Sequence, residues 1–325
     1  MRTHRLGRTD IEVSVLGFGA AGIGNLFTAV DDDTARAAVT AAWDCGVRYF
    51  DTAPYYGRGL SERRLGQALA DRPRSEFVVS TKIGRVLVRD AAFAGTDPAP
   101  GLFDVRDELY CELDYSRDGV YRSFEASLTR LALDRVDIVY IHDAEQHMDT
   151  AIGQSVPALI ELREQGVVRA IGAGMNTVGD LRRFVADTDI DVVMLANRWT
   201  LLDRTARSLL DDCARRGVAV VLAAPFNSGL LASAWPMPGA HFHYEPVRPA
   251  VLARARALAR VCEQHGAVLP HAALQFPLLE PVVASVVTGM RTAHEARANA
   301  EGIQALLPPA LWTDLDRAMA PENLP

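Results

Sequence analysis

The sequence contains few cysteines, and their positions exclude two classes of small protein. The four cysteines are scattered, with no C-x-x-C pair and no regular spacing: Cys45, Cys111, Cys213 and Cys262. Zinc fingers need ligands paired at short spacing, and disulfide scaffolds need a dense cysteine framework. We therefore expect neither, and we expect the chain to work in a reducing compartment.

Long apolar runs and long basic runs are also missing. Nowhere do about 18 apolar residues stand together, and no apolar stretch of signal-peptide type follows the first charged residues. The net charge is −7, without a lysine or arginine run on the scale of a tail, which argues against nucleic acid or a membrane surface as partner. We expect a cytoplasmic protein that binds a small molecule; the sequence leaves open whether it is a monomer or a homo-oligomer.

What the sequence does contain is a repeated alternation of apolar runs and helical segments. Apolar residues make up 49% and charged residues 23% of the 325 residues, as in ordinary globular proteins. Segments with helical periodicity separate eight apolar runs of strand character, namely "VSVLGFGA", "VRYFD", "FVVSTK", "VDIVYIH", "VVRAIGAG", "DVVMLAN", "VAVVLAAP" and "PVVASVVTG".

This alternation predicts a barrel. Strands that are apolar throughout and alternate with helices are typical of parallel sheets covered by helices. Eight such units favour a single-domain (β/α)₈ TIM barrel over residues 1–325. The alternative, an open doubly wound sheet, more often has about five or six strands and a G-x-G-x-x-G turn. The glycine-rich "GFGAAGIG" after the first strand has glycines at that spacing, at Gly17, Gly19 and Gly22, but the eight units favour the barrel.

Three segments fall outside the simple alternation. Residues up to about 13 precede the first strand and predict a hairpin that caps the bottom of the barrel. Residues 84–118 and 226–249 are too long for simple connections. Because both follow a strand, they leave the barrel at its C-terminal face, where the substrate loops of such barrels lie.

The predicted C-terminal strand ends carry four polar residues and a glycine, namely Asp51, Lys82, His142, Asn197 and Gly289. Tyr56 lies one short loop beyond Asp51. A tyrosine near its reference pKa of about 10 is a poor acid or base at neutral pH, but a neighbouring Lys⁺ lowers that pKa. Asp51 would orient Lys82, and His142 would donate to a substrate oxygen. Such a set moves protons but no electrons, so a redox reaction needs a bound hydride carrier.

Each of these residues also has an ordinary structural interpretation. Asp51 could be a helix N-cap or a structural ion pair with Lys82. Tyr55 and Tyr56 could simply pack, and a single histidine at a strand end is more often a core residue than a catalytic one. Lys82 is harder to explain in this way, because a lysine inside an apolar run needs a partner.

Several motifs carry a resemblance to a known family. The stretches "FDTAPYYG", "STKIGR", "IHDAE" and "VVTGMRTAHEARANAEG" resemble the aldo-keto reductase superfamily, from "RLGRTDIEVSVLGFG" almost to the C-terminus. The order of "YIHDAEQH", "LANRWTLLD" and "AAPFNSGLL" is similar to the branch that oxidises L-fucose, D-threo-aldoses, L-galactose and pyridoxal. The resemblance implies a (β/α)₈ barrel and four catalytic residues. Tyr56 would be the proton donor or acceptor, Lys82 and Asp51 would lower its pKa, and His142 would orient the carbonyl.

The same resemblance implies a nicotinamide dinucleotide across the barrel mouth. Asn197 and Asn176 would contact the carboxamide, and Trp199 would stack on the nicotinamide ring unless it packs in the core. The pyrophosphate would lie on Pro225, Phe226, Asn227, Gly229 and Leu230, unless these form an ordinary glycine turn. The adenosine end would lie on Gly289, Met290, Arg291, Thr292 and Asn299.

Arg291 bears on which nucleotide binds. A guanidinium beside a helix start suits a ribose 2′-phosphate, which favours NADP, although a solvated surface arginine is an alternative. Many family members use a lysine–serine pair for that phosphate, and this chain has "MRT" instead. NAD therefore remains possible.

The resemblance and the two long segments together predict the substrate. Their polar and aromatic residues suit a hydroxyl-rich ring: Arg85, Arg106, Asp107, Tyr110, Asn227, Trp235, His241, Phe242, His243 and Tyr244. We expect oxidation at C1 of an L-fucose or D-threo-type aldose. Pyridoxal 4-dehydrogenase and general aldehyde reductase are the alternatives.

Two alternatives belong to other classes of function. One is a regulatory subunit that binds the nucleotide without significant turnover, which the presence of all four catalytic residue types disfavours. The other is a metal-dependent hydrolase using His142, Asp143, His241 and His243, but the last two stand in a long polar segment and no carboxylate cluster accompanies them. We therefore expect no metal site.

Overall fold

Parallel strands close into a barrel within residues 1–89, 102–105 and 109–319, the residues that the computed structural model describes. Going around the barrel, the strands follow the order β10-β11-β14-β3-β4-β5-β8-β9. The eight-stranded closed barrel confirms the fold expected from the alternating pattern. The barrel strands are β3 (Leu16–Gly19), β4 (Tyr49–Asp51), β5 (Val78–Ile83), β8 (Ile138–His142), β9 (Ala170–Met175), β10 (Val192–Ala196), β11 (Ala219–Ala223) and β14 (Val283–Gly289).

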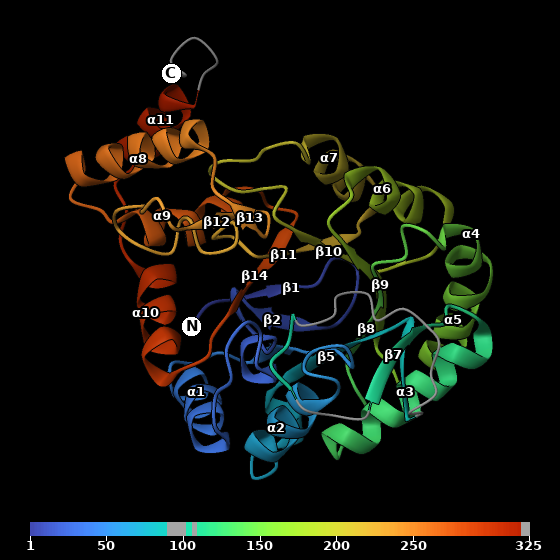
Figure 1. Ribbon diagram of the computed structural model, residues 1–325. Helices are drawn as coiled ribbons and strands as arrows, with labels where there is room; N and C mark the ends of the chain where they lie inside the picture. The colour runs from blue at the N-terminus through green and yellow to red at the C-terminus, as the bar shows by residue number, and fades with distance from the viewer. Residues whose placement is uncertain (90–101, 106–108, 320–325) are drawn as a thin grey trace.

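Helices surround the barrel and cover the outer faces of its strands (Figure 1). Local signals start several of them: Asp31 caps the first, accepting a hydrogen bond from the Thr34 amide at 2.7 Å. The helices are α1 (Asp32–Asp44), α2 (Leu60–Leu69), α3 (Arg117–Leu131), α4 (Met148–Thr150), α5 (Val156–Glu164), α6 (Val178–Asp187), α7 (Arg207–Arg216), α8 (Pro249–Gln264), α9 (Leu269–Gln275), α10 (Ala293–Gln304) and α11 (Pro309–Ala318).

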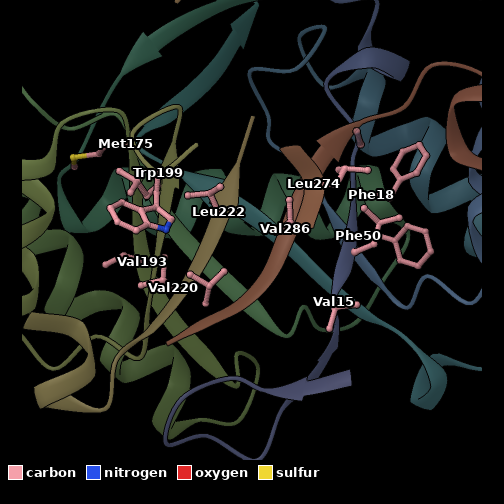
Figure 2. Packing of buried hydrophobic residues seen from close by; sticks show 14 of the residues in the cluster. Val15, Phe18, Phe50, Met175, Val193, Trp199, Val220, Leu222, Leu274 and Val286 are labelled. Carbon is pink, nitrogen blue, oxygen red and sulfur yellow. The ribbon is translucent and has the colours of Figure 1, made fainter. Parts of the chain in front are cut away.

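The core has an outer and an inner layer. In the outer layer, side chains such as Val193, Leu222 and Val286 point from the strands toward the helices (Figure 2). In the inner layer, Tyr49 and Tyr140 fill the barrel interior. Because side chains alternate across a strand, a strand apolar throughout supplies both layers.

Short hairpins lie at both ends of the barrel. β1 (Thr3–Arg5) pairs antiparallel with β2 (Glu12–Ser14), and its buried residues Leu6, Ile11 and Val13 pack against the inner layer. Two more hairpins lie in segments that follow barrel strands. β6 (Arg85–Arg89) pairs with β7 (Leu109–Leu113), and β12 (His241–Phe242) pairs with β13 (Glu245–Pro246). Across the described ranges, no helix is long and apolar enough to cross a membrane.

Candidate active site

A buried ion pair joins two neighbouring strands at the C-terminal end of the barrel. Asp51 ends β4, and Lys82 lies one residue before the end of β5. The Lys82 Nζ donates to both carboxylate oxygens of Asp51, at 2.6 and 2.8 Å, and to the Thr52 carbonyl at 2.9 Å. All three ammonium donors are therefore used, which fixes the charge in position.

A chain of hydroxyl groups supports this ion pair from inside the barrel. The Ser80 hydroxyl donates to Asp51 Oδ1 at 2.7 Å and lies 3.1 Å from the Tyr49 hydroxyl, which is 3.1 Å from that of Tyr140. These residues lie outside the set that the sequence motifs predict. The sequence does contain a signal for Ser80, because Ser80 precedes Lys82 by two positions and its side chain therefore faces the same side of β5.

Tyr56 lies above Lys82 and beside His142. The Lys82 Nζ is 4.7 Å from the centroid of the Tyr56 ring, and the imidazole of His142 is 5.9 Å away at an interplanar angle of 89°. The tyrosine, lysine and histidine expected from the sequence therefore do converge.

The electrostatics of Tyr56 differ from the expectation. Burial raises the pKa of its phenol well above the ordinary value, Asp51 and Asp143 raise it further, and Arg85 lowers it. The expectation that Lys82 and Asp51 lower this pKa is wrong in its net direction. Lys82 is already neutralised by Asp51, so its field does not offset the desolvation of a phenolate. Tyr56 is held as a neutral phenol.

His142 is also held neutral. Burial lowers the pKa of its imidazole well below the ordinary value, and Arg85 and Lys82 lower it further. Its carbonyl accepts a hydrogen bond from the Tyr115 hydroxyl at 2.6 Å, which fixes the end of β8. Its Nδ1 is buried and has no hydrogen-bond partner in the part of the chain that is described. A neutral imidazole keeps one N–H to offer to a ligand.

A second ion pair borders the histidine. Arg85 Nη2 lies 2.6 Å from Asp143 Oδ2, and the same carboxylate oxygen is 3.6 Å from His142 Nε2. The Arg85 guanidinium also lies over the Tyr55 ring, 4.3 Å from its centroid. Arg85 and Asp143 were expected in other roles, and the sequence does not reveal that they pair, because they are far apart along the chain.

Three asparagine side chains lie together where neighbouring strands end. Asn176 follows β9, Asn197 follows β10, and Asn227 lies three residues beyond Ala224, which follows β11. Asn197 Nδ2 is 3.4 Å from Asn176 Oδ1, and Asn227 Nδ2 is 3.4 Å from the Asn197 carbonyl. The side-chain oxygens of Asn197 and Asn227 are buried without a partner among the residues described. Since buried polar atoms are normally paired, these oxygens are suited to a ligand that donates hydrogen bonds.

Trp199 packs beside the barrel. Its indole is 4% exposed and belongs to the outer core layer (Figure 2). It stacks on Phe276, with ring centroids 5.7 Å apart, and the Arg207 guanidinium lies 4.4 Å from its ring. Its Nε1 is buried without a partner among the residues described, and its stacking on nicotinamide stays a prediction.

Two more predicted contacts have buried side chains. Met290 is fully buried and Leu230 is 1% exposed, and both pack in the same core. Their side chains therefore do not line the mouth, and only their backbone remains available. Pro225 is buried and Phe226 is half-buried. By contrast, Gly229 and Gly289 are exposed, and no heavy atom outside their own neighbours lies within 4 Å of where a Cβ would stand.

The start of α10 is capped, and its arginine has a partner. Thr292 Oγ1 accepts from the Glu295 amide at 3.2 Å, and Glu295 Oε2 accepts from the Arg291 amide at 2.7 Å. The Arg291 guanidinium lies 3.5 Å from the other carboxylate oxygen of Glu295. Asn299 lies on the same helix, half-buried. A carboxylate thus accompanies the positive charge that was expected to meet a phosphate.

The residues at the mouth fit a nicotinamide dinucleotide better than a metal ion. The unpartnered amide oxygens and the open glycines leave polar groups and room for a flat, hydrogen-bonding ligand. No group of three or more His, Cys, Asp or Glu side chains suited to a metal occurs in residues 1–89, 102–105 and 109–319. His243 stacks on Phe242, 4.0 Å between centroids, and its Nδ1 lies 2.9 Å from Arg198 Nη1.

Comparisons with known proteins agree with this geometry. The chain is 43% identical to D-threo-aldose 1-dehydrogenase of a Pseudomonas species, over 95% of this chain and 94% of the relative. It is 36% identical to pyridoxal 4-dehydrogenase of Microbacterium luteolum, over 95% of each. The fold is similar to that of aldo-keto reductase AKR11C1 from Bacillus halodurans in its holo form, with a TM-score of 0.81, 26% identity, and 98% and 96% of the two chains covered.

The match to a family model covers almost the whole barrel. Residues 15–320 match the model of the aldo/keto reductase family. That range contains every barrel strand and all four residues that converge at the mouth. The chain therefore belongs to the aldo/keto reductase family and is an oxidoreductase.

Proposed function

We propose that this oxidoreductase moves a hydride between a nicotinamide nucleotide and C1 of an aldose of the L-fucose or D-threo type. The observation that carries the chemistry is the convergence of Tyr56 and His142 above the Lys82–Asp51 pair. The aldose is supported by the similarity to D-threo-aldose 1-dehydrogenase along nearly the full length of both chains.

In the reductive direction, Tyr56 donates its proton to the carbonyl oxygen of the substrate. Its raised pKa keeps that proton available at neutral pH. The neutral His142 donates one N–H to the same oxygen and so orients the carbonyl. Lys82, whose charge Asp51 holds in position, offsets only part of the cost of the phenolate that remains. In the oxidative direction, Tyr56 must first lose its proton before it can accept one from the C1 hydroxyl.

Aldo-keto reductases use NAD(P)H, which supplies the hydride when bound. The amide oxygens of Asn197 and Asn227 would receive the donors of the nicotinamide carboxamide, with Asn176 orienting Asn197. The backbone around Gly229 would face the pyrophosphate, and Gly289 and α10 would face the adenosine.

We further propose that NAD is preferred over NADP. The expectation of NADP depended on Arg291, and Glu295 now stands 3.5 Å from its guanidinium. A carboxylate there repels a 2′-phosphate and accepts a hydrogen bond from a ribose 2′-hydroxyl.

The test measures the absorbance of reduced nicotinamide as the enzyme acts on a panel of aldoses, pyridoxal and short aldehydes. Each substrate is assayed once with the NAD couple and once with the NADP couple. We expect the highest kcat/KM for a D-threo-type aldose with NAD. If kcat/KM for short aliphatic aldehydes exceeds kcat/KM for every aldose and for pyridoxal, the aldose assignment is wrong. Nucleotide binding without turnover of any substrate would indicate a regulatory subunit instead.

Pyridoxal is the second candidate substrate. A specific observation favours it, because the relative named pyridoxal 4-dehydrogenase matches 95% of this chain. Its aldehyde would meet the same Tyr56 and His142, so the panel above separates the two candidates by kcat/KM alone.

A further inference from the structure

The segment between β11 and α8 contains a tight turn in a costly backbone form. β12 and β13 pair His241 with Pro246 and Phe242 with Glu245, so only two residues turn the chain. These are His243, with φ of 52°, and Tyr244, with φ of 67°. Two-residue hairpin turns with positive φ at both positions normally use asparagine and glycine, because larger side chains are strained there. An aromatic pair at these positions calls for an explanation.

Contacts from two strand ends hold the turn in place. Arg198, which follows β10, brings Nη1 to 2.9 Å from His243 Nδ1. Ser228, in the segment after β11, accepts a hydrogen bond from the Tyr244 amide at 2.9 Å. Phe242 stacks on His243 with 4.0 Å between ring centroids. The strained conformation is therefore fixed from outside the hairpin.

The turn directs the Tyr244 side chain to the catalytic end of the barrel. The hydrogen bonds of the turn anchor it to Arg198 and Ser228, the residues that directly follow Asn197 and Asn227 of the site. Tyr244 in turn is among the groups that raise the pKa of Tyr56. Tyr244 nevertheless stays 53% exposed, so part of its surface faces open space. The turn thus lies over the ends of β10 and β11, beside the asparagines of the site.

We propose that the His243–Tyr244 turn is kept strained in order to hold the Tyr244 phenol against the hydroxyl on C2 of the substrate, which makes Tyr244 a specificity-determining residue. This inference rests on the proposed function, because a short aliphatic aldehyde carries no such hydroxyl. Tyr56 meets the oxygen on C1, so a phenol in the same space meets the next polar group along the sugar. A hydrogen-bonding partner left unpaired discriminates strongly against an analogue that lacks the hydroxyl.

The experiment compares two variants with the unaltered enzyme on an aldose and on its 2-deoxy analogue. Tyr244→Phe removes only the hydroxyl. His243→Asn combined with Tyr244→Gly places the residues that suit the turn while removing the side chain. Tyr121→Phe is the matched control, because it removes a phenolic hydroxyl that bonds to Glu161, 2.9 Å away, on the helical surface. Nucleotide affinity is followed by tryptophan fluorescence.

We expect Tyr244→Phe to lower kcat/KM for the aldose about tenfold and to leave the 2-deoxy analogue and the nucleotide affinity unchanged. The Asn–Gly double variant is expected to lower kcat/KM for the aldose at least as much, while its Tm rises or stays the same. Tyr121→Phe is expected to leave kcat/KM unchanged for both the aldose and its 2-deoxy analogue.

Three results would overturn the inference while leaving the proposed function intact. They are an equal loss on the aldose and its analogue, weaker nucleotide binding in Tyr244→Phe, or a lower Tm in the Asn–Gly variant. The second would place Tyr244 over the nicotinamide, and the third would mean that the turn is not strained on balance. If the unaltered enzyme oxidises no aldose, the proposed function fails and this inference fails with it.

Discussion

Buried polar groups are hydrogen-bonded differently at the two ends of the barrel. At the N-terminal end, both carboxylate oxygens of Asp137 are bonded: Arg74 and the Val79 amide lie 2.7 and 2.8 Å from Oδ2, and Arg169 lies 3.2 Å from Oδ1. At the C-terminal end, His142 Nδ1 and Asn197 Oδ1 are buried without partners among the residues described. The Asp137 carboxylate is fully bonded without a ligand, although Arg74 Nε beside it is a buried donor without a partner, whereas at the second end the unpartnered atoms lie in the candidate site itself.

The backbone shows the same contrast. Eleven described residues other than glycine have positive φ, and ten of them lie in segments that follow a barrel strand. The exception, Ala132, ends helix α3. Left-handed backbone costs about 1–2 kcal/mol per residue. Among the described residues, strained backbone is therefore concentrated at the end of the barrel that carries the candidate site, which is where such strain is expected if it serves function.

Tyr56→Phe should give the largest effect at the C-terminal end. We expect kcat to fall about 10²–10⁴-fold, because the phenol is the group placed to exchange a proton with the substrate oxygen. Nucleotide affinity should stay unchanged, since the ring is kept. Steady-state kinetics at saturating nucleotide measure the first and fluorescence titration the second. Near-normal turnover would remove Tyr56 from the proposed chemistry.

Asp137→Ala should give the converse effect at the other end. It removes the carboxylate that balances the charge of Arg74 and accepts from the Val79 amide, in a site where that carboxylate is 2% exposed, so we expect a loss of about 3 kcal/mol in the free energy of unfolding. The kcat of the folded enzyme should not change. Asp10→Ala is the control, because Asp10 meets Arg169 with 82% of its side chain exposed and should cost less than about 0.5 kcal/mol. Denaturant unfolding measures both, and equal losses would contradict the contrast between buried and exposed pairs.

Sequence periodicity predicted the barrel and which residues lie at its strand ends. Runs apolar throughout could belong only to strands buried on both faces, and Asp51, His142 and Gly289 do end barrel strands. The long segments were recognisable by length alone, although Arg106 and Asp107 lie outside the described residues.

What periodicity could not show is how strands far apart in the chain meet. The Arg85–Asp143 pair depends on the register of β5 against β8, which no local pattern contains. The contacts of Trp199 with Phe276 and Arg207 were likewise invisible, because these partners come from other segments. The direction of the Tyr56 pKa was missed because burial depends on the folded surroundings.

The raised pKa of Tyr56 predicts how the rates in the two directions depend on pH. Below its pKa the phenol keeps its proton, so the reductive kcat should stay level from about pH 6 to 9. The oxidative kcat needs the phenolate and should rise about tenfold per pH unit over the same range. Rates at saturating nucleotide and substrate in both directions give the answer. An oxidative kcat that is level between about pH 7 and 9 would mean that Lys82 lowers the phenol pKa after all.

Glu295→Gln should give the smallest effect and tests the outer edge of the C-terminal end. Glutamine can still accept the hydrogen bond from the Arg291 amide, now 2.7 Å from Glu295, so the start of α10 should stay folded. Only the negative charge beside the Arg291 guanidinium is lost. Because Arg291 and Glu295 are both partly exposed, with 43% and 36% of their side chains accessible, solvent screens the gain. We expect NADP to bind about fivefold more tightly and the affinity for NAD to change less than about twofold.

Arg291→Ala should have the opposite effect, weakening the binding of NADP alone. Fluorescence titration of all three proteins with both nucleotides decides the point, and equal changes for NAD and NADP would show that this ion pair shapes the helix rather than the choice of nucleotide.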